Sequence, residues 1–279
     1  MNFTEGQWRS LIDNEPVRTA RLGSVSSVDT DQLNANITNP FDGIVYEIQT
    51  PIEGLSDGDA VETWPASIGS PDGQGTKLTY SEGAFDGIDA VSADGPGGFG
   101  QDDPVLNIDP GIVDVIFEPV FSWLMTIQSN NDGWRMGYID GDTGDQELRV
   151  EYDDGTLEFD LRGTNDIGTL RTTSISADIE LDDGAVRTIV FNRTAPPDGG
   201  VSGGDEWEIW AGEQGGEISQ LETEIEPGFE ESTSDTIPDN GVNLLDALDG
   251  SMSQFALADE TFSEDQIQVF HELALPTNE

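Results

Sequence analysis

Residues 148–161 carry a hairpin pattern that strongly limits how this chain can fold. Two arms that alternate apolar and charged residues, LRVEY at 148–152 and LEFDL at 157–161, flank the turn sequence DDGT at 153–156. Alternation with a period of two places the apolar side chains of a strand on one face. The Asp-Gly pair supplies the positive-φ backbone that a tight hairpin turn requires. We therefore expect paired antiparallel strands with one buried face.

Short runs of the same character recur along the chain. They are rich in β-branched and aromatic residues and are separated by Gly and Pro, as at 43–49, 113–117, 121–127, 186–191 and 206–210. Many short strands with almost no helix between them are typical of an antiparallel sandwich or barrel. The sequence thus predicts an all-β fold, and we expect the Gly- and Pro-rich stretches 94–101, 195–205 and 226–241 to be loops.

A helix is expected only near the ends of this sequence. Ser263 and Gln266 have the spacing of a capping box, in which each side chain bonds the backbone of the other residue. Ile267, Phe270 and Leu273 then follow on one helical stripe. A similar pattern at 4–12 is interrupted by Gly6. The clearer prediction is a short C-terminal helix.

The charge of the chain is extreme, with 57 Asp and Glu against 10 Lys and Arg and a formal net charge of −47. Self-repulsion at this density strains a folded domain at ordinary salt, whereas at about 1 M salt the screening length falls to about 3 Å. We therefore expect a protein adapted to brine. The alternatives are a disordered chain or an acidic partner of a basic protein, but 35% hydrophobic residues in periodic runs can build a core.

The composition also excludes several classes of function. No basic stripe exists to neutralise phosphates, so nucleic acid is not an expected partner. The chain contains no apolar stretch of about 18 residues, so no membrane span is predicted. Cysteine is absent, which rules out disulfides and thiolate metal sites. Since residues 1–6 lack the basic and apolar regions of a secretory signal, we expect a protein that either stays in the cytosol or leaves the cell by another route, such as inside a virus particle released by lysis.

Residues 1–40 differ from the rest of the chain. Within 1–21, Arg9, Arg18 and Arg21 balance three acidic residues, so residues 22–279 carry the whole net charge. A neutral arm suits docking onto another acidic protein, because two bare acidic surfaces repel. We expect Trp8 and the three arginines to contact neighbouring subunits of a homo-oligomer or other particle proteins. The alternative is an arm that packs on its own domain.

Several segments, in order and spacing, resemble concanavalin A-like, laminin G-like jelly-roll domains. The matching segments are 41–46, 54–65, 78–91, 188–193, 206–212 and 255–267. The region 94–110 departs from the family pattern, and residues 1–40 have no counterpart in it. The resemblance implies one antiparallel two-sheet jelly-roll sandwich over residues 41–279, preceded by an N-terminal arm at 1–40.

A calcium site is a candidate at Asp140, Asp142 and Asp145. These carboxylates lie close together on a Gly-containing turn, and hard cations prefer oxygen ligands. The resemblance to laminin G-like domains also implies a calcium ion at the rim. The alternative is a solvated acidic hairpin tip.

Carbohydrate contacts are candidates at Trp64 and Trp134, whose indole rings could stack on sugars. The alternative, a place in the core, is common for tryptophan at strand spacing. Catalysis is not expected, because the carboxylate pattern of related glycosidases is incomplete at 151–153 and at 180–182. His271 is the single histidine, and we expect it at the solvent edge of the terminal helix.

These observations predict a non-enzymatic structural or adhesion subunit of a haloarchaeal virus particle, such as a spike, turret, fibre or baseplate. Its rim loops would contact host-surface glycans, and its expected location is the virion. The alternatives are a cellular carbohydrate-binding or adhesion module of a halophilic archaeon and a glycoside hydrolase.

Overall fold

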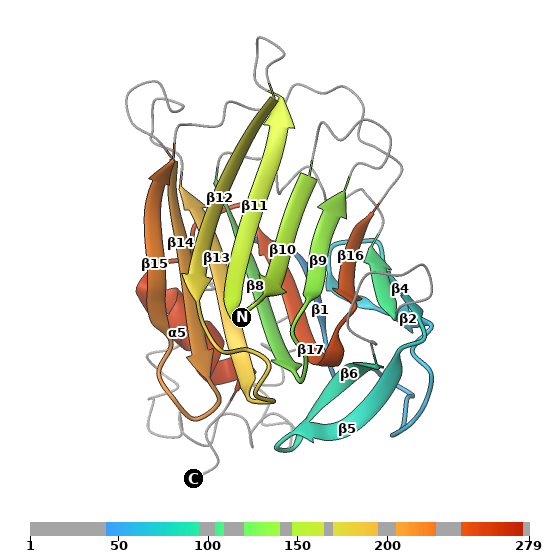
Figure 1. The fold of residues 1–279 in the computed structure, drawn as a ribbon. Coiled ribbons are helices and arrows are strands. Elements are labelled where there is room, and N and C mark those ends of the chain that lie inside the picture. The colour runs from blue at the N-terminus through green and yellow to red at the C-terminus, as the bar shows by residue number, and fades with distance from the viewer. Residues whose placement is uncertain are drawn as a thin grey trace, which may run out of the picture.

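The computed structural model describes residues 43–94, 104–108, 120–139, 147–164, 170–194, 205–226 and 241–275. Within these ranges two antiparallel sheets pack face to face, and one short helix lies behind them (Figure 1). The predicted all-β, two-sheet sandwich with a short C-terminal helix is confirmed. The predicted arm at 1–40 and its boundary with the domain lie outside the described residues.

The first sheet, sheet A, contains nine of the described strands. Seven of them follow in the spatial order β15 (Ser219–Glu226), β14 (Asp205–Glu213), β13 (Val186–Thr194), β8 (Val120–Ser129), β17 (Asp249–Ala258), β1 (Ile44–Gln49) and β3 (Ala66–Ile68). The other two, β5 (Thr79–Phe85) and β6 (Ile88–Asp94), form a hairpin that joins the sheet where β6 pairs with β17. Strand β17 thus has β8 along one side and β6 followed by β1 along the other.

The second sheet, sheet B, contains eight described strands. Their spatial order is β12 (Leu170–Asp178), β11 (Thr156–Thr164), β10 (Glu147–Asp153), β9 (Trp134–Ile139), β16 (Val242–Asp246), β7 (Val105–Ile108), β4 (Gly73–Thr76) and β2 (Thr63–Trp64). The hairpin predicted at 148–161 is confirmed as β10 and β11, in which Leu148 pairs with Leu161. Asp154 and Gly155 form its turn with φ angles of 49° and 78°.

The main core fills the space between the two sheets. Strand alternation turns Val150 and Phe159 of sheet B inward, and both are fully buried. Phe159 stacks on Phe191 of sheet A with ring centroids 4.6 Å apart. Trp123 packs edge-on against Phe255 at the same centroid distance. The predicted inward faces therefore meet across the sandwich.

A second, smaller core lies on the outer face of sheet A. Helix α5 (Glu264–Ala274) begins at the predicted capping box, where Ser263 and Gln266 bond each other's backbone N–H groups. Its Ile267 and Phe270 are buried with Leu124 and other apolar side chains of sheet A. Helix α5 therefore covers part of this sheet face, whereas no described element covers the outer face of sheet B (Figure 1).

Candidate functional site

The outer face of sheet B is the candidate binding surface. Along its strands, inward positions such as Leu106, Met136, Val150 and Phe159 are 0–1% exposed. Most of the alternate positions carry polar or charged side chains on the opposite face. Sheet B lies in front in Figure 1, and its outer face is a wide surface of mostly polar side chains.

One line of paired residues crosses all eight described strands of this surface. We call it the polar row, and it consists of Thr63, Gln74, Asn107, Asn243, Gly137, Arg149, Asp160 and Ser174. Each residue is the register partner of the next, so neighbouring Cβ atoms are about 4.5–5.5 Å apart except at Gly137, which has none. Side chains from distant parts of the chain therefore share one line.

The half of the polar row on β2, β4, β7 and β16 carries no charge. Its residues are Thr63, Gln74, Asn107 and Asn243, which we call the amide strip. Asn107 Nδ2 donates a hydrogen bond to Asn243 Oδ1 at 2.8 Å. Thr63, Gln74 and Asn243 are exposed, and Asn107 is half-buried. An uncharged patch of hydroxyls and carboxamides stands out in a chain with a net charge of −47.

Gly137 follows the amide strip in the row and contributes no side chain. A Cβ atom at this position would lie 2.1 Å from the Leu148 carbonyl oxygen, and the φ angle of 132° favours glycine. Strands β9 and β10 therefore approach closely here. Because Gly137 has no side chain, it separates the amide strip from the charged side chains that follow.

The other half of the row is centred on Arg149. Its guanidinium contacts Asp160, and it lies 3.1 Å from Glu151 and 3.8 Å from Glu158. Burial raises the pKa of Glu158, the neighbouring Asp160 carboxylate raises it further, and Arg149 lowers it. Since Glu158 is also the cross-strand partner of Glu151, three carboxylates share one cation.

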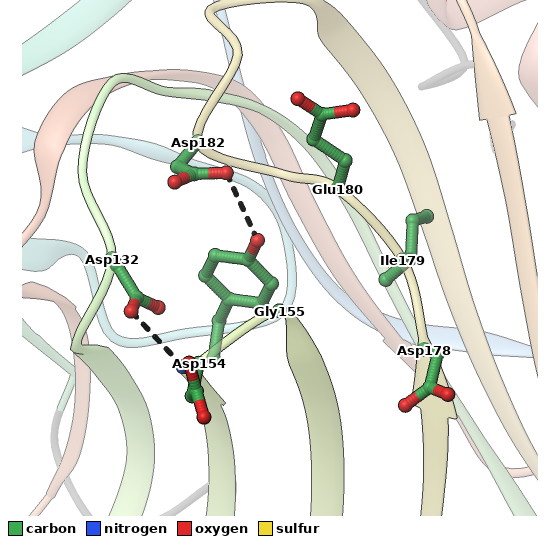
Figure 2. A pocket seen from close by; sticks show the side chains of 8 residues that line it. Asp132, Asp154, Gly155, Asp178, Ile179, Glu180 and Asp182 are labelled. Carbon is green, nitrogen blue, oxygen red and sulfur yellow. Dashed lines mark hydrogen bonds between the residues drawn. The ribbon is translucent and has the colours of Figure 1, made fainter.

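A pocket of about 540 Å³ lies at one end of the sandwich, beside the β10–β11 turn. Five carboxylates line it together with Tyr152, Gly155 and Ile179, and they belong to Asp132, Asp154, Asp178, Glu180 and Asp182. The Tyr152 hydroxyl donates a hydrogen bond to Asp182 at 3.1 Å, and the Asp154 N–H donates one to Asp132 at 3.0 Å (Figure 2). Burial is the largest cause that raises the pKa of the Tyr152 hydroxyl, and the Asp182 carboxylate raises it as well.

Among the described residues, no group of three or more His, Cys, Asp or Glu side chains is arranged to hold a metal ion. The predicted calcium ligands Asp140, Asp142 and Asp145 lie outside the described residues. The same is true of the predicted partner contacts Trp8, Arg9, Arg18 and Arg21. In the part of the chain that is described, no helix is long and apolar enough to cross a bilayer.

The structure places Trp64 and Trp134 in the core, and both are 0% exposed. Trp64 donates its indole N–H to the Gln49 carbonyl at 3.1 Å, and Trp134 packs against Tyr152 with ring centroids 5.8 Å apart. Neither ring therefore presents a face to a sugar. The reason is strand alternation, which turns each indole inward and its neighbours Thr63 and Arg135 outward.

His271 is a correction to the sequence interpretation, because it is buried rather than at a solvent edge. Its side chain is 1% exposed and its Nε2 lies 3.2 Å from the Gly216 carbonyl oxygen. The buried stripe of α5 is Ile267, Phe270, His271 and Ala274, with the i, i+3, i+4, i+7 spacing of a helix face. Burial lowers the pKa of the imidazole.

The comparisons with known proteins reveal distant structural neighbours. Neither a protein-family model nor a characterised protein sequence matches the chain. The botulinum neurotoxin serotype G binding domain aligns with a TM-score of 0.47 and 8% identity over 81% of this chain and 50% of that one. The binding domain of botulinum neurotoxin DC in complex with SialylT gives 0.46 and 12% over 85% and 53%.

A sialidase of Trypanosoma rangeli in complex with sialic acid aligns with a TM-score of 0.44 and 10% identity over 82% of this chain and 33% of that one. The chain thus spans about half the length of the toxin domains and a third of the sialidase. Likeness at these scores supports no inference about what the chain does. The resemblance to concanavalin A-like domains stays a prediction at the level of the family, whereas the two-sheet sandwich is observed.

Sequence reasoning missed the polar row. Its residues do leave a signal, since polar side chains alternate with apolar ones in β10 and β11, and single polar side chains interrupt the apolar runs of β7 and β16. The register that joins them is not encoded locally, because Asn107 and Asn243 are 136 positions apart. The signal could have indicated outward positions but not their alignment.

Proposed function

We propose that this chain is a non-enzymatic structural or adhesion subunit of a virus particle that infects a haloarchaeon, and that its sandwich contacts host-surface glycans. The observation that carries the glycan contact is the polar row, which aligns hydroxyl, carboxamide and charged side chains across the outer face of sheet B. Sugars are recognised by many hydrogen bonds to such groups, each with defined donors and acceptors.

The charge of the chain supports both the proposed high-salt environment and the proposed assembly into a particle. A net charge of −47 favours a folded state at high salt, where self-repulsion is screened. The neutral segment 1–21 would allow the acidic sandwich to attach to acidic neighbours. Many copies on one particle would multiply weak glycan contacts through avidity.

The location is tested by a mass-spectrometric inventory of purified particles. We expect the chain among the virion proteins, and we expect a protein lacking residues 1–21 to fold but to be missing from particles. Detection only in the cytosol of uninfected cells would instead favour a cellular protein, and full incorporation of the truncated chain would remove the anchoring role of the arm.

One observation favours a second candidate, a glycoside hydrolase. Glu151 and Glu158 are direct cross-strand partners on the outer face of sheet B, and the pKa of Glu158 is raised. A carboxylic acid and a carboxylate about 5–5.5 Å apart are the groups that retaining glycosidases use. We favour binding because Arg149 pairs with both groups, which holds them as a charged network.

The two candidates differ in the release of reducing ends from polysaccharides. We expect no release above background in high salt by the unmodified chain, and therefore no difference between it and the Glu158→Gln variant. Release that Glu158→Gln abolishes, while the variant stays folded, would establish the hydrolase instead.

A further inference from the structure

We infer that the amide strip selects neutral glycans and rejects anionic ones. This inference rests on the proposed glycan contact and names the class of sugar. It requires that the strip offer free hydrogen-bonding groups, that its surroundings disfavour negative charge, and that an apolar partner fit it poorly.

The strip offers paired donors and acceptors. After Asn107 Nδ2 has donated to Asn243 Oδ1, Asn107 Oδ1 and Asn243 Nδ2 make no hydrogen bond within the described residues. One is an acceptor and the other a donor, and cross-strand pairing holds the two side chains together. Adjacent hydroxyls of a sugar ring can donate to one and accept from the other. Gln74, the register partner of Asn107, adds a further carboxamide.

The surroundings disfavour an anionic sugar. The cation of the row is Arg149, whose guanidinium already lies among the carboxylates of Glu151, Glu158 and Asp160. Arg135, which points outward from β9 beside the row, is the register partner of Asp246 and is not a free cation either. A sulfate or carboxylate of a ligand would have to compete with these groups and approach them closely. High salt removes repulsion beyond about 3 Å, but not the repulsion and desolvation of groups in contact.

An apolar partner also fits poorly. Where the structure describes the outward side chains of sheet B, they are polar or charged apart from the half-buried Val105. The described tryptophans are at most 7% exposed, so none of them provides a stacking face. Neutral polyhydroxylated chains are the ligands whose chemistry matches this surface, and they would be held by hydrogen bonds alone.

The experiment measures binding of the full chain, in 1 M KCl or more, to two immobilised sets of oligosaccharides. One set contains neutral hexose oligomers, and the other contains matched oligomers that carry sulfate, uronate or sialic acid. The strip is altered with Asn107→Asp and Asn243→Asp, which keep the size of the side chain, remove its donors and add charge. The matched control is Asn130→Asp, an exposed residue directly after β8 of sheet A.

We expect neutral oligomers to bind better than anionic ones. Each strip variant should weaken neutral binding by about tenfold or more, since one hydrogen bond that involves a charge or an unsatisfied group is worth about that factor. Asn130→Asp should leave binding unchanged. Near-UV circular dichroism and the thermal midpoint show whether each variant is folded.

Four other outcomes would each overturn a distinct statement. Tighter binding of anionic oligomers would refute the selectivity and leave the glycan contact in place. Neutral binding that the strip variants do not weaken would place the contact elsewhere. Absence of binding to either set would contradict the proposed function itself. If a basic peptide binds, and binds more tightly to the Asp variants, the face recognises cations rather than sugars.

Discussion

The imidazole of His271 is enclosed between helix α5 and the β14–β15 turn. Gly212 permits this approach, because a Cβ atom there would lie 3.0 Å from His271 Cε1 and 2.7 Å from the Ile218 backbone. A buried imidazole resists protonation because burial penalises the charged form. The folded chain therefore binds a proton at this site less readily than the unfolded chain.

This difference predicts a pH-dependent stability that is specific to one residue. The unfolded histidine titrates near 6.5 and the folded one below it, so the free energy of unfolding should fall as the pH decreases below 6.5. The slope from His271 should approach about 1.4 kcal/mol per pH unit until the folded imidazole protonates. Denaturant unfolding across this range should reveal the slope.

The His271→Gln variant is the comparison, since it removes the titrating group and leaves every carboxylate in place. We expect the difference in unfolding free energy between the two proteins to shrink or change sign as the pH falls below 6.5. Parallel pH profiles would mean that the imidazole protonates equally well in both states.

At the scale of elements, strand β9 sets the spacing of the polar row. Gly137 and Gly155 both have positive φ angles, at 132° and 78°, but only Gly137 has a backbone atom where a Cβ would be placed. The two glycines therefore separate the cost of an unfavourable φ angle from the cost of a steric clash.

We predict that Gly155→Ala costs about 1–2 kcal/mol, the usual penalty for a residue with a side chain in left-handed backbone. Gly137→Ala should cost more, because the Leu148 carbonyl oxygen must also move, and it should weaken binding at the amide strip by displacing β9. Urea unfolding gives the two free energies. Equal losses of unfolding free energy in the two variants would show that β9 and β10 can move apart at Gly137 without strain.

Elements with local signals were predictable from the sequence. The β10–β11 hairpin depends on a turn whose residues are adjacent, and α5 begins at a capping box that spans four residues. The polar row depends on pairing between strands far apart, and a two-residue strand such as β2 carries too little pattern to show which way Trp64 points. In α5, the sequence pattern was interpreted as one buried stripe through Ile267, Phe270 and Leu273. The buried face instead includes His271, which lies at the i+4 position from Ile267.

At the scale of the whole molecule, charge governs folding. With 57 acidic and 10 basic residues, the surface repels itself over the Debye length, which falls from about 10 Å at 0.1 M salt to about 3 Å at 1 M. The sandwich buries a large aromatic core in spite of this repulsion. The balance between surface charge repulsion and burial of the core should therefore depend on ionic strength.

We predict that the chain gains stability as KCl rises through about 0.1–1 M, the range in which screening becomes effective. Tryptophan fluorescence should report the transition, since Trp123 and Trp207 are buried in the main core. Sucrose of equal osmolality is the control, because it favours burial without screening charge. Equal stabilisation by sucrose, or full stability without salt, would contradict the electrostatic explanation.

Strand β17 lies at the centre of sheet A, next to β8, β6 and β1, although it begins only at Asp249. While a ribosome is still synthesising the chain, β1 and β8 have no central neighbour, and their hydrogen-bonding edges stay open. Long-range closure of this kind is slow and leaves unpaired edges prone to aggregation. The nascent chain must therefore wait with these two strand edges open until β17 emerges.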